Sequence, residues 1–287
     1  MKVLITGVSG FLGHELTNYL IKKKIYVIGL FNTKKPKFQK SKFLKLKKIN
    51  LINKSFNADV DIIIHCASIT PVNSNDDKEL YKNNIKITKN VLKISSKIHS
   101  FFFMSSMSVY GKIRDKVVFE KTIKRFPNYY GKSKLECERM LKKLNREKNI
   151  SVFVFRLPGV VGEKSHSNFI TKLVENILTN QPIKISNLNS KFNNIIHSKD
   201  IFNFIIKILK KKLTGFYTLN LASKNKIKIN TILKYLLNNS HYSGKIFHKG
   251  EDRTFTINFL KASKLGFRPK TVIKNLKLFF NEKKKII

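Results

Sequence analysis

The sequence predicts an α/β protein whose core is a doubly wound parallel sheet. In the first half of the 287-residue chain, short apolar runs alternate with stretches that repeat apolar residues at helical spacing. Strands and helices that alternate in this way form parallel sheets, because each helix carries the chain back to the start of the next strand. Glycines at the first strand–helix junction favour the same fold class.

Five apolar runs in this half are expected to be buried parallel strands, since apolar side chains fill both faces of each run. They comprise residues 2–7, 26–31, 60–68, 100–106 and 151–158. Between them, the spacing of apolar residues predicts helices at residues 11–23, 78–97 and 128–148, the last opening after Pro127.

The first junction reads TGVSGFLGHEL, in which Gly7, Gly10 and Gly13 stand three residues apart. Glycine lets the backbone turn tightly there. It also lets a pyrophosphate approach the helix N-terminus, whose free amides and dipole favour anions. The turn therefore predicts a dinucleotide-binding domain of the Rossmann type.

After about residue 160 the pattern becomes mixed. Helices are expected near residues 167–179, 199–211, 229–238 and 271–282, separated by short extended pieces and by Gly or Pro. We expect residues 1–160 to form the NAD(P)-binding Rossmann domain. Residues 161–287 are expected to form a smaller, mixed substrate-binding lobe, some of whose elements pack back on the first domain.

Composition narrows the class of protein. Apolar residues make up 42% of the chain, which is typical of a globular protein. No apolar run approaches the roughly 18 residues of a membrane span. Residues 1–7 lack the separate charged and apolar regions of a signal peptide, so none is expected. Cys66 and Cys137 give no disulfide framework, which fits a reducing cytoplasm. The seven histidines show no metal-ligand spacing, so no metal is expected.

The charge raises the question of a polyanionic partner. Fifty-eight basic residues against 17 acidic ones give a net charge of +41. The lysines are spread along the chain, with one dense tract at residues 34–48, and only seven of the basic residues are arginine, the residue that best reads guanine edges. We therefore expect no specific nucleic-acid partner, and expect the charge to attract a small polyanionic substrate.

The segment YYGKSKLECE places Tyr130 and Lys134 four residues apart, on one face of the expected helix. A lysine ammonium beside a phenol favours the phenolate, which makes the tyrosine a usable general acid or base. An exposed, lysine-rich helix face would give the same spacing by chance. Other motifs in the chain must therefore decide whether this pair is functional.

Five ordered motifs resemble the extended short-chain dehydrogenase/reductases, the group of nucleotide-sugar epimerases, dehydratases and reductases. They are TGVSGFLG, DIIIHCAS, MSSMSVYG, YGKSK and RLPGVVG. The resemblance continues through NNIIHSKDI and LGFRPKTVIKNL, so it spans essentially the whole chain. It implies an NAD(P)-dependent nucleotide-sugar epimerase or keto-reductase that acts in surface polysaccharide or glycan precursor synthesis.

The resemblance also implies residue roles. Tyr130 is the acid/base, Lys134 holds the nicotinamide ribose, and Ser106 hydrogen-bonds the reacting substrate oxygen, whereas Ser105 only ends a strand. Tyr129 does not fit, because Ser133 stands four residues after it. The expected cofactor contacts, besides Tyr130 and Lys134, are Gly7, Ser9, Gly10, Phe11, Leu12, Gly13, Asn32, Lys34, Lys35, Asn50, Leu51, Ala67, Ser68, Asn84 and Pro158.

Departures from the family pattern bear on the substrate. Met107 and Ser108 stand where 4,6-dehydratases of the group carry an Asp-Glu pair, which argues against dehydration. Gly159 stands at a substrate-contacting position where epimerases often have asparagine. Arg253 is the candidate for a diphosphate clamp, because arginine forks onto phosphate oxygens; a plain surface arginine is the alternative.

The end of the second expected strand bears on the choice of cofactor. An acid at that position hydrogen-bonds the ribose 2′-hydroxyl and selects NAD. Here Phe31 and Asn32 end the strand, and Lys34 and Lys35 follow. NADP is therefore expected over NAD, with Asn50 as a neutral partner for adenine. The abundance of lysine in this chain is the alternative explanation.

Two other functions stay open. One is an oxidoreductase that acts on a non-nucleotide carbonyl or alcohol. The other is a non-catalytic, RNA-associated binding protein on the same fold, although a pure binder has no need of Ser106, Tyr130 and Lys134. The resemblance further implies a homodimer through the helix that bears Tyr130.

Overall fold

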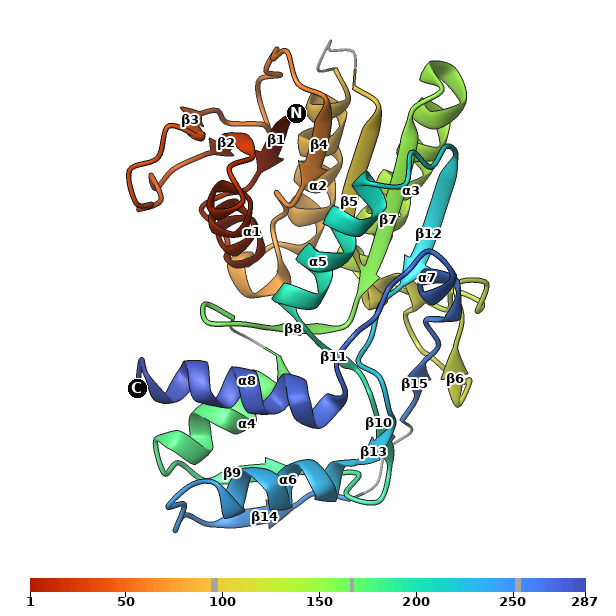
Figure 1. Cartoon of the computed structure of the whole chain (residues 1–287). Coiled ribbons are helices and arrows are strands. Elements are labelled where there is room, and N and C mark those ends of the chain that lie inside the picture. Colours follow the sequence, from red (N-terminus) through yellow and green to blue (C-terminus); the bar gives the residue numbers. More distant parts are fainter. Residues whose placement is uncertain (94–97, 166–167, 251–253) are drawn as a thin grey trace. The chain divides into compact units, whose positions relative to one another are not determined.

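The computed structural model describes residues 1–93, 98–165, 168–250 and 254–287 (Figure 1). The chain forms two compact units, each assembled from several segments. The first comprises Met1–Lys112, Ile123–Arg156 and Ile208–Leu219. The second comprises Ile113–Thr122, Leu157–Lys207 and Asn220–Ile287.

Seven strands form the sheet of the first unit in the order β12-β7-β5-β4-β1-β2-β3 (Figure 1). Their bounds are β1 (Lys2–Thr6), β2 (Tyr26–Phe31), β3 (Leu44–Lys48), β4 (Ile62–His65), β5 (Ser100–Ser106), β7 (Ser151–Leu157) and β12 (Phe216–Asn220). The neighbours from β3 to β5 pair in parallel. The strand order reverses beside β1, and doubly wound sheets bind ligands at the carboxyl ends of strands at that point.

Three helices cover this sheet, α1 (Phe11–Lys22) on one face and α2 (Asp77–Leu92) and α3 (Tyr129–Lys148) on the other (Figure 1). Side chains from α2 and α3 join strand residues in one buried apolar cluster. The short 3-10 helices η1 (Pro71–Asn73) and η2 (Met107–Tyr110) follow β4 and β5. The predicted doubly wound, Rossmann-type sheet is confirmed.

Two strands of the sheet lie outside the predicted set. One is β3, which falls in the lysine-rich tract, where half-buried leucines alternate with exposed lysines. Such alternation puts the leucines on one face, and the lysines are tolerated because β3 is an edge strand. The other is β12, which comes late in the chain, where the sequence pattern is mixed.

The second unit contains the remaining elements. Its helices are α4 (Phe169–Leu178), α5 (Ser198–Leu209), whose last two residues belong to the first unit, α6 (Ile229–Asn238), α7 (Leu260–Lys264) and α8 (Val272–Lys284). Its strands pair two by two: β8 (Gly159–Val161) with β11 (Ile195–His197), β9 (Ile183–Ile185) with β14 (Ile246–His248), β10 (Lys191–Phe192) with β13 (Ile227–Lys228), and β6 (Val117–Val118) with β15 (Thr256–Ile257).

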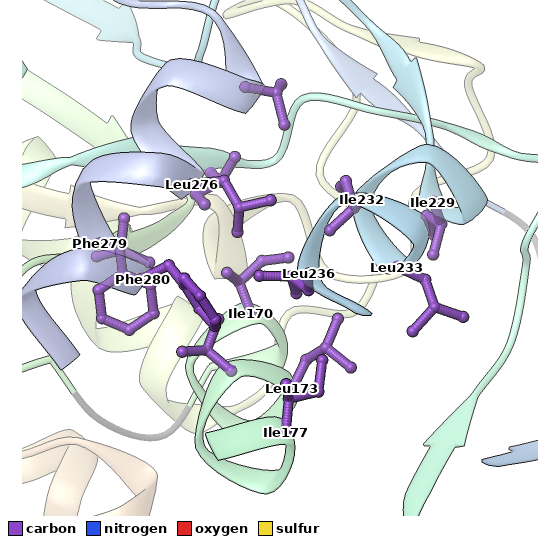
Figure 2. Close-up of a cluster of buried hydrophobic side chains, with 14 of the residues drawn as sticks. Ile170, Leu173, Ile177, Ile229, Ile232, Leu233, Leu236, Leu276, Phe279 and Phe280 are labelled. Atoms are coloured by element: carbon purple, nitrogen blue, oxygen red, sulfur yellow. The ribbon is translucent and has the colours of Figure 1, made fainter. Parts of the chain in front are cut away.

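The core of the second unit lies between three of its helices. Figure 2 shows side chains of α4, α6 and α8 that point toward one another, among them Leu173, Leu236 and Phe280. All three are at most 4% exposed. Burying a side chain of this size stabilises the fold by about 1.5–3 kcal/mol, so this core accounts for a substantial part of the stability of the unit.

Candidate active site

The predicted glycine turn joins β1 to α1. Gly7 has a φ of +73°, a conformation that L-residues with side chains rarely adopt. A Cβ at Gly7 would also lie 2.8 Å from the backbone nitrogen of Ala67, at the end of β4. The backbone N–H groups of Gly7 and Val8 donate to the carbonyl of Leu30 on β2. The turn is thus fixed between the ends of three strands.

A cavity of about 350 Å³ opens over this turn. Eight of the residues predicted to contact the cofactor line it together: Gly7, Ser9, Gly10, Asn32, Asn50, Leu51, Ala67 and Ser68. The other lining residues are Leu30, Phe31, Ile49, Ile52, Cys66, Ile69, Asn73 and Ile87. Most of these are apolar residues that stand next to predicted residues in the chain. The sequence analysis did not predict that they contact the cofactor.

The cavity lining fits the pyrophosphate part of a dinucleotide. Gly10 precedes the first turn of α1, and a Cβ built there would meet only the Gly7 carbonyl oxygen, at 3.4 Å, so the space over the helix N-terminus is open. No carboxylate lines the cavity. Burial raises the pKa of the Cys66 thiol to about 12, so this lining group is uncharged at neutral pH. An anion approaching the α1 amides therefore meets no negative charge in the lining.

The other predicted cofactor residues of this unit lie beside the cavity. Phe11, Leu12 and Gly13 form the first turn of α1, and Lys34 and Lys35 are exposed in the loop after β2. Asn84 is buried on α2. Its amide group bonds both the N–H and the carbonyl of Ile69 (2.8 and 3.0 Å) and donates to Ser133 Oγ (3.3 Å). Asn84 thus ties the cavity wall to α3.

Tyr130 and Lys134 lie in the first two turns of α3, which Asn128 caps by accepting a hydrogen bond from the Gly131 N–H. The Lys134 ammonium is 5.5 Å from the centre of the Tyr130 ring and donates to the Met104 carbonyl at 3.0 Å. Lys134 is 4% exposed, whereas Tyr130 is half-buried. The Lys134 ammonium and the Tyr130 ring therefore lie near each other on α3, and their catalytic roles stay predictions.

Ser106 ends β5 and caps η2, with its Oγ 3.1 Å from both the N–H and the Oγ of Ser108. The start of α3 packs directly against this turn, because a Cβ at Gly131 would collide with the Ser108 carbonyl. Gly131 therefore sets how closely the helix that bears Tyr130 approaches the segment that bears Ser106. The sequence places this glycine beside Tyr130 but gives no sign of the contact.

A buried ion pair supports the same segment. Arg156 on β7 donates to both carboxylate oxygens of Glu138 on α3 (3.1 and 2.6 Å) and to the Tyr110 hydroxyl (2.8 Å). Burial opposes the charge of Arg156, but the Glu138 carboxylate overcomes this effect and raises the pKa of the guanidinium. Ser105 donates to the same carboxylate at 2.6 Å. Local sequence patterns could not reveal this pair, because it joins two different elements.

His65, at the end of β4, is 1% exposed, and both of its ring nitrogens form hydrogen bonds. Thr88 Oγ1 donates to the Asn84 carbonyl, so it accepts from His65 Nε2 (3.1 Å), and Nδ1 then accepts from Thr6 Oγ1 (2.7 Å). Burial, with Lys134 nearby, lowers the pKa of His65 to about 3. This neutral histidine joins β1, β4 and α2 below the cavity.

We expect His65 to make the stability depend on pH. The unfolded histidine titrates near 6.5 and the folded one near 3, so between these values the unfolded chain binds one proton more. The contribution of His65 to the free energy of unfolding is therefore complete above about pH 6.5. It falls by about 1.4 kcal/mol per pH unit as the pH drops toward 3. Denaturant unfolding of the native chain and of His65→Gln at pH 7 and 5 measures this slope. His99→Gln, at a half-buried position of the same unit, should keep the slope of the native chain.

Three predicted residues lie outside the first unit. Pro158 and Gly159 belong to the second unit, where Gly159 begins β8 and pairs with Ile195 of β11. Arg253, the candidate diphosphate clamp, lies outside the described residues. The roles of these three residues stay predictions.

In the ranges 1–93, 98–165, 168–250 and 254–287, no cluster of His, Cys, Asp and Glu could hold a metal ion. Within the same ranges, every helix is too short or too polar to cross a bilayer.

Solved structures share this fold over the whole chain. UDP-glucuronic acid 4-epimerase from Bacillus cereus, in complex with NAD, superposes with a TM-score of 0.83 at 22% identity, covering 100% of this chain and 97% of the other. UDP-glucose 4-epimerase from Thermotoga maritima, with UDP-glucose, gives 0.82 at 18% identity, covering 100% and 99%.

Sequence relatives extend over most of the chain as well. A UDP-glucose epimerase of Bacillus subtilis named YtcB, described as uncharacterized, is 26% identical over 96% of this chain and 95% of its own. The D-erythronate dehydrogenase of Haemophilus influenzae is 25% identical over 77% of each chain.

The family model described as NAD dependent epimerase/dehydratase family matches residues 3–222, which is well over half of the chain. The match runs from β1 past β12 and includes the glycine turn and the Tyr130–Lys134 pair. The predicted membership of the extended short-chain dehydrogenase/reductases, and with it the prediction of an enzyme of this type, is confirmed. The chain belongs to the NAD dependent epimerase/dehydratase family.

Proposed function

We propose that this chain is a nucleotide-sugar epimerase or keto-reductase that uses Tyr130 as its general acid/base. The observation that carries the proposal is the Tyr130–Lys134 pair on α3, with the ammonium 5.5 Å from the centre of the phenol ring. This pair belongs to the same unit as the glycine-lined cavity, and Asn84 connects the cavity wall to α3 through Ser133.

We assign a separate role in cofactor binding or proton transfer to each of these residues. Gly7, Gly10 and the first turn of α1 would hold the cofactor pyrophosphate, and Asn50 would contact the adenine. When bound, the nicotinamide cofactor supplies hydride exchange with a carbon of the substrate. Tyr130 moves the proton on the oxygen of that carbon, and Ser106 hydrogen-bonds the same oxygen. Lys134, whose ammonium lies 5.5 Å from the centre of the Tyr130 ring, would hold the ribose hydroxyls.

The substrate class rests on the relatives. Several of them are named for reactions of UDP-, CDP- or dTDP-sugars, among them the CDP-abequose synthase of Salmonella muenchen. The D-erythronate dehydrogenase supports the second candidate, an oxidoreductase acting on a non-nucleotide alcohol. Met107 and Ser108, in place of an Asp-Glu pair, argue against dehydration.

Assaying the protein with a panel of UDP-, GDP- and dTDP-sugars, and with D-erythronate, separates these functions. Cofactor absorbance and product identity are followed together, with both cofactors. Sugar interconversion without net cofactor change identifies an epimerase, and net oxidation of the reduced cofactor identifies a reductase. Turnover of D-erythronate alone would overturn the nucleotide-sugar proposal.

For the cofactor itself we propose NADP over NAD. Asn32 lines the cavity at the end of β2, where an acid would repel a 2′-phosphate, and the cavity lining contains no carboxylate. Lys34 and Lys35 follow in the exposed loop. The solved structure from Bacillus cereus is a complex with NAD, so the proposed preference must be tested with both cofactors.

Replacing Lys34 and Lys35 together with alanine is expected to weaken NADPH binding by about tenfold and to leave NADH binding unchanged, because two charge-assisted contacts to phosphate are lost. Fluorescence titration of both reduced cofactors measures this. The double substitution of Lys210 and Lys211 by alanine, in an exposed turn of the same unit, removes the same charge and should change neither affinity. Equal or tighter NADH binding by the native chain would contradict the preference.

Assembly and location stay predictions. We propose a homodimer through α3, which sedimentation of the purified protein tests, and a cytoplasmic location. We further propose that no specific nucleic acid binds, since arginine is scarce among the basic residues.

A further inference from the structure

The loop after β2, residues 32–43, is unusually basic but is fixed at one point. It carries lysines at positions 34, 35, 37, 40 and 42. Its Phe38 ring stacks on His14 of α1, with ring centres 4.4 Å apart and planes 14° from parallel. His14 Nε2 also lies 3.0 Å from the Lys37 carbonyl oxygen. One buried histidine thus holds two consecutive residues of the loop.

The hydrogen bonds of His14 are mutually consistent. Asn18 Nδ2, which can only donate, lies 3.3 Å from His14 Nδ1, so Nδ1 is an acceptor. Nε2 therefore carries the hydrogen in the neutral ring and donates it to the Lys37 carbonyl. His14 is only 7% exposed, so helix α1 fixes the position of the imidazole.

The anchored lysines line a cleft beside the cofactor cavity. The cleft has a volume of about 1210 Å³, and its lining includes Lys35, Lys37, Lys40 and Lys42 but no carboxylate. Phe31, at the end of β2, lines both this cleft and the cofactor cavity, so the two spaces are neighbours across this residue. Among the described residues, no carboxylate forms an ion pair with these lysines.

We infer that His14 and Phe38 are positioning residues that hold Lys35 and Lys37 as a subsite for the 2′-phosphate of NADP. This inference rests on the proposed function, because it concerns the same cofactor. A free lysine loop would lose backbone conformational freedom on binding phosphate, and this loss weakens the binding. The contact with α1 removes part of that cost before the cofactor arrives.

The test is the affinity for NADPH and for NADH, measured by fluorescence titration without turnover. His14→Ala and Phe38→Ala are each expected to weaken NADPH binding about three- to tenfold and to leave NADH binding unchanged. Phe38→Tyr, which keeps a ring for stacking, should bind NADPH as the native chain does. Phe43→Ala is the matched control, since Phe43 lies in the same loop beneath Lys42 and not on His14.

A second measurement reports on the loop directly. Limited digestion with a lysine-specific protease, mapped by mass spectrometry, should show faster cleavage after residues 34–42 in His14→Ala and Phe38→Ala than in the native chain, because an unanchored loop enters the protease more readily. Phe43→Ala should be cleaved as slowly as the native chain.

The outcomes separate this inference from the proposed function. If the native chain prefers NADPH, and the Lys34 and Lys35 substitutions abolish that preference while His14→Ala and Phe38→Ala do not, the cofactor proposal stands and the positioning role is overturned. Equal losses for NADPH and NADH would mean general damage to the cavity and would also overturn it. If the native chain does not prefer NADPH, the NADP proposal fails and the inference fails with it.

Discussion

Tyr130→Phe is expected to lower turnover by about a hundredfold or more, while the cofactor still binds. The substitution removes the hydroxyl that moves the proton and leaves a ring of the same shape 5.5 Å from the Lys134 ammonium. Loss of a general acid/base commonly costs a factor of about 100 to 10,000. Steady-state kinetics on the substrate found in the panel, with a cofactor titration alongside, measures both effects.

Tyr129→Phe provides the matched control, because Tyr129 is the neighbouring tyrosine on the same helix turn. Its ring makes an edge contact with Tyr81, with ring centres 6.4 Å apart, and does not depend on its hydroxyl for that contact. Turnover by Tyr129→Phe should stay within a few fold of the native rate. A large loss in Tyr129→Phe, with native rates in Tyr130→Phe, would exchange the two assignments.

Gly10→Val is expected to lower cofactor affinity by about two orders of magnitude while the protein stays folded. Gly10 has a φ of −83°, which valine tolerates, and a Cβ there meets only the Gly7 carbonyl oxygen. The added methyl groups would therefore project into the open space over the α1 amides, where the pyrophosphate is expected to bind. Cofactor titration and a thermal unfolding curve on the same sample measure the two properties.

Gly13→Val serves as a contrast, because it is expected to destabilise the fold before it affects cofactor binding. A Cβ at Gly13 would collide with the Gly7 carbonyl and approach the Val8 backbone, so a side chain there would push apart the glycine turn and α1. This variant should lose stability first, and lose cofactor binding only as a result. Cofactor affinity that is unchanged in a folded Gly10→Val protein would exclude the turn as the pyrophosphate site.

Local patterns were sufficient for much of this molecule. Residues 26–31 and 100–106, predicted as strands, coincide with β2 and β5, and residues 229–238, predicted as a helix, coincide with α6. Periodicity identifies such elements because the burial of one face depends on neighbouring residues in the chain. The glycine turn and the Tyr130–Lys134 spacing are likewise short-range features, so the sequence alone placed both on the correct junction and helix.

The details of the site depend instead on contacts between distant segments. His14 meets Phe38, Glu138 meets Arg156, and Asn84 meets Ile69, and in each case the two residues come from different elements. Strand β3, at the edge of the sheet, was not predicted from its lysine-rich sequence. Its pairing with β2 decides its conformation more than the β-propensity of its residues does. Strand order and side-chain partners follow from how the elements pack, which periodicity does not encode. The sequence therefore determined the fold class and predicted the chemistry-bearing residues, and the tertiary structure alone decided which residues hold them in place.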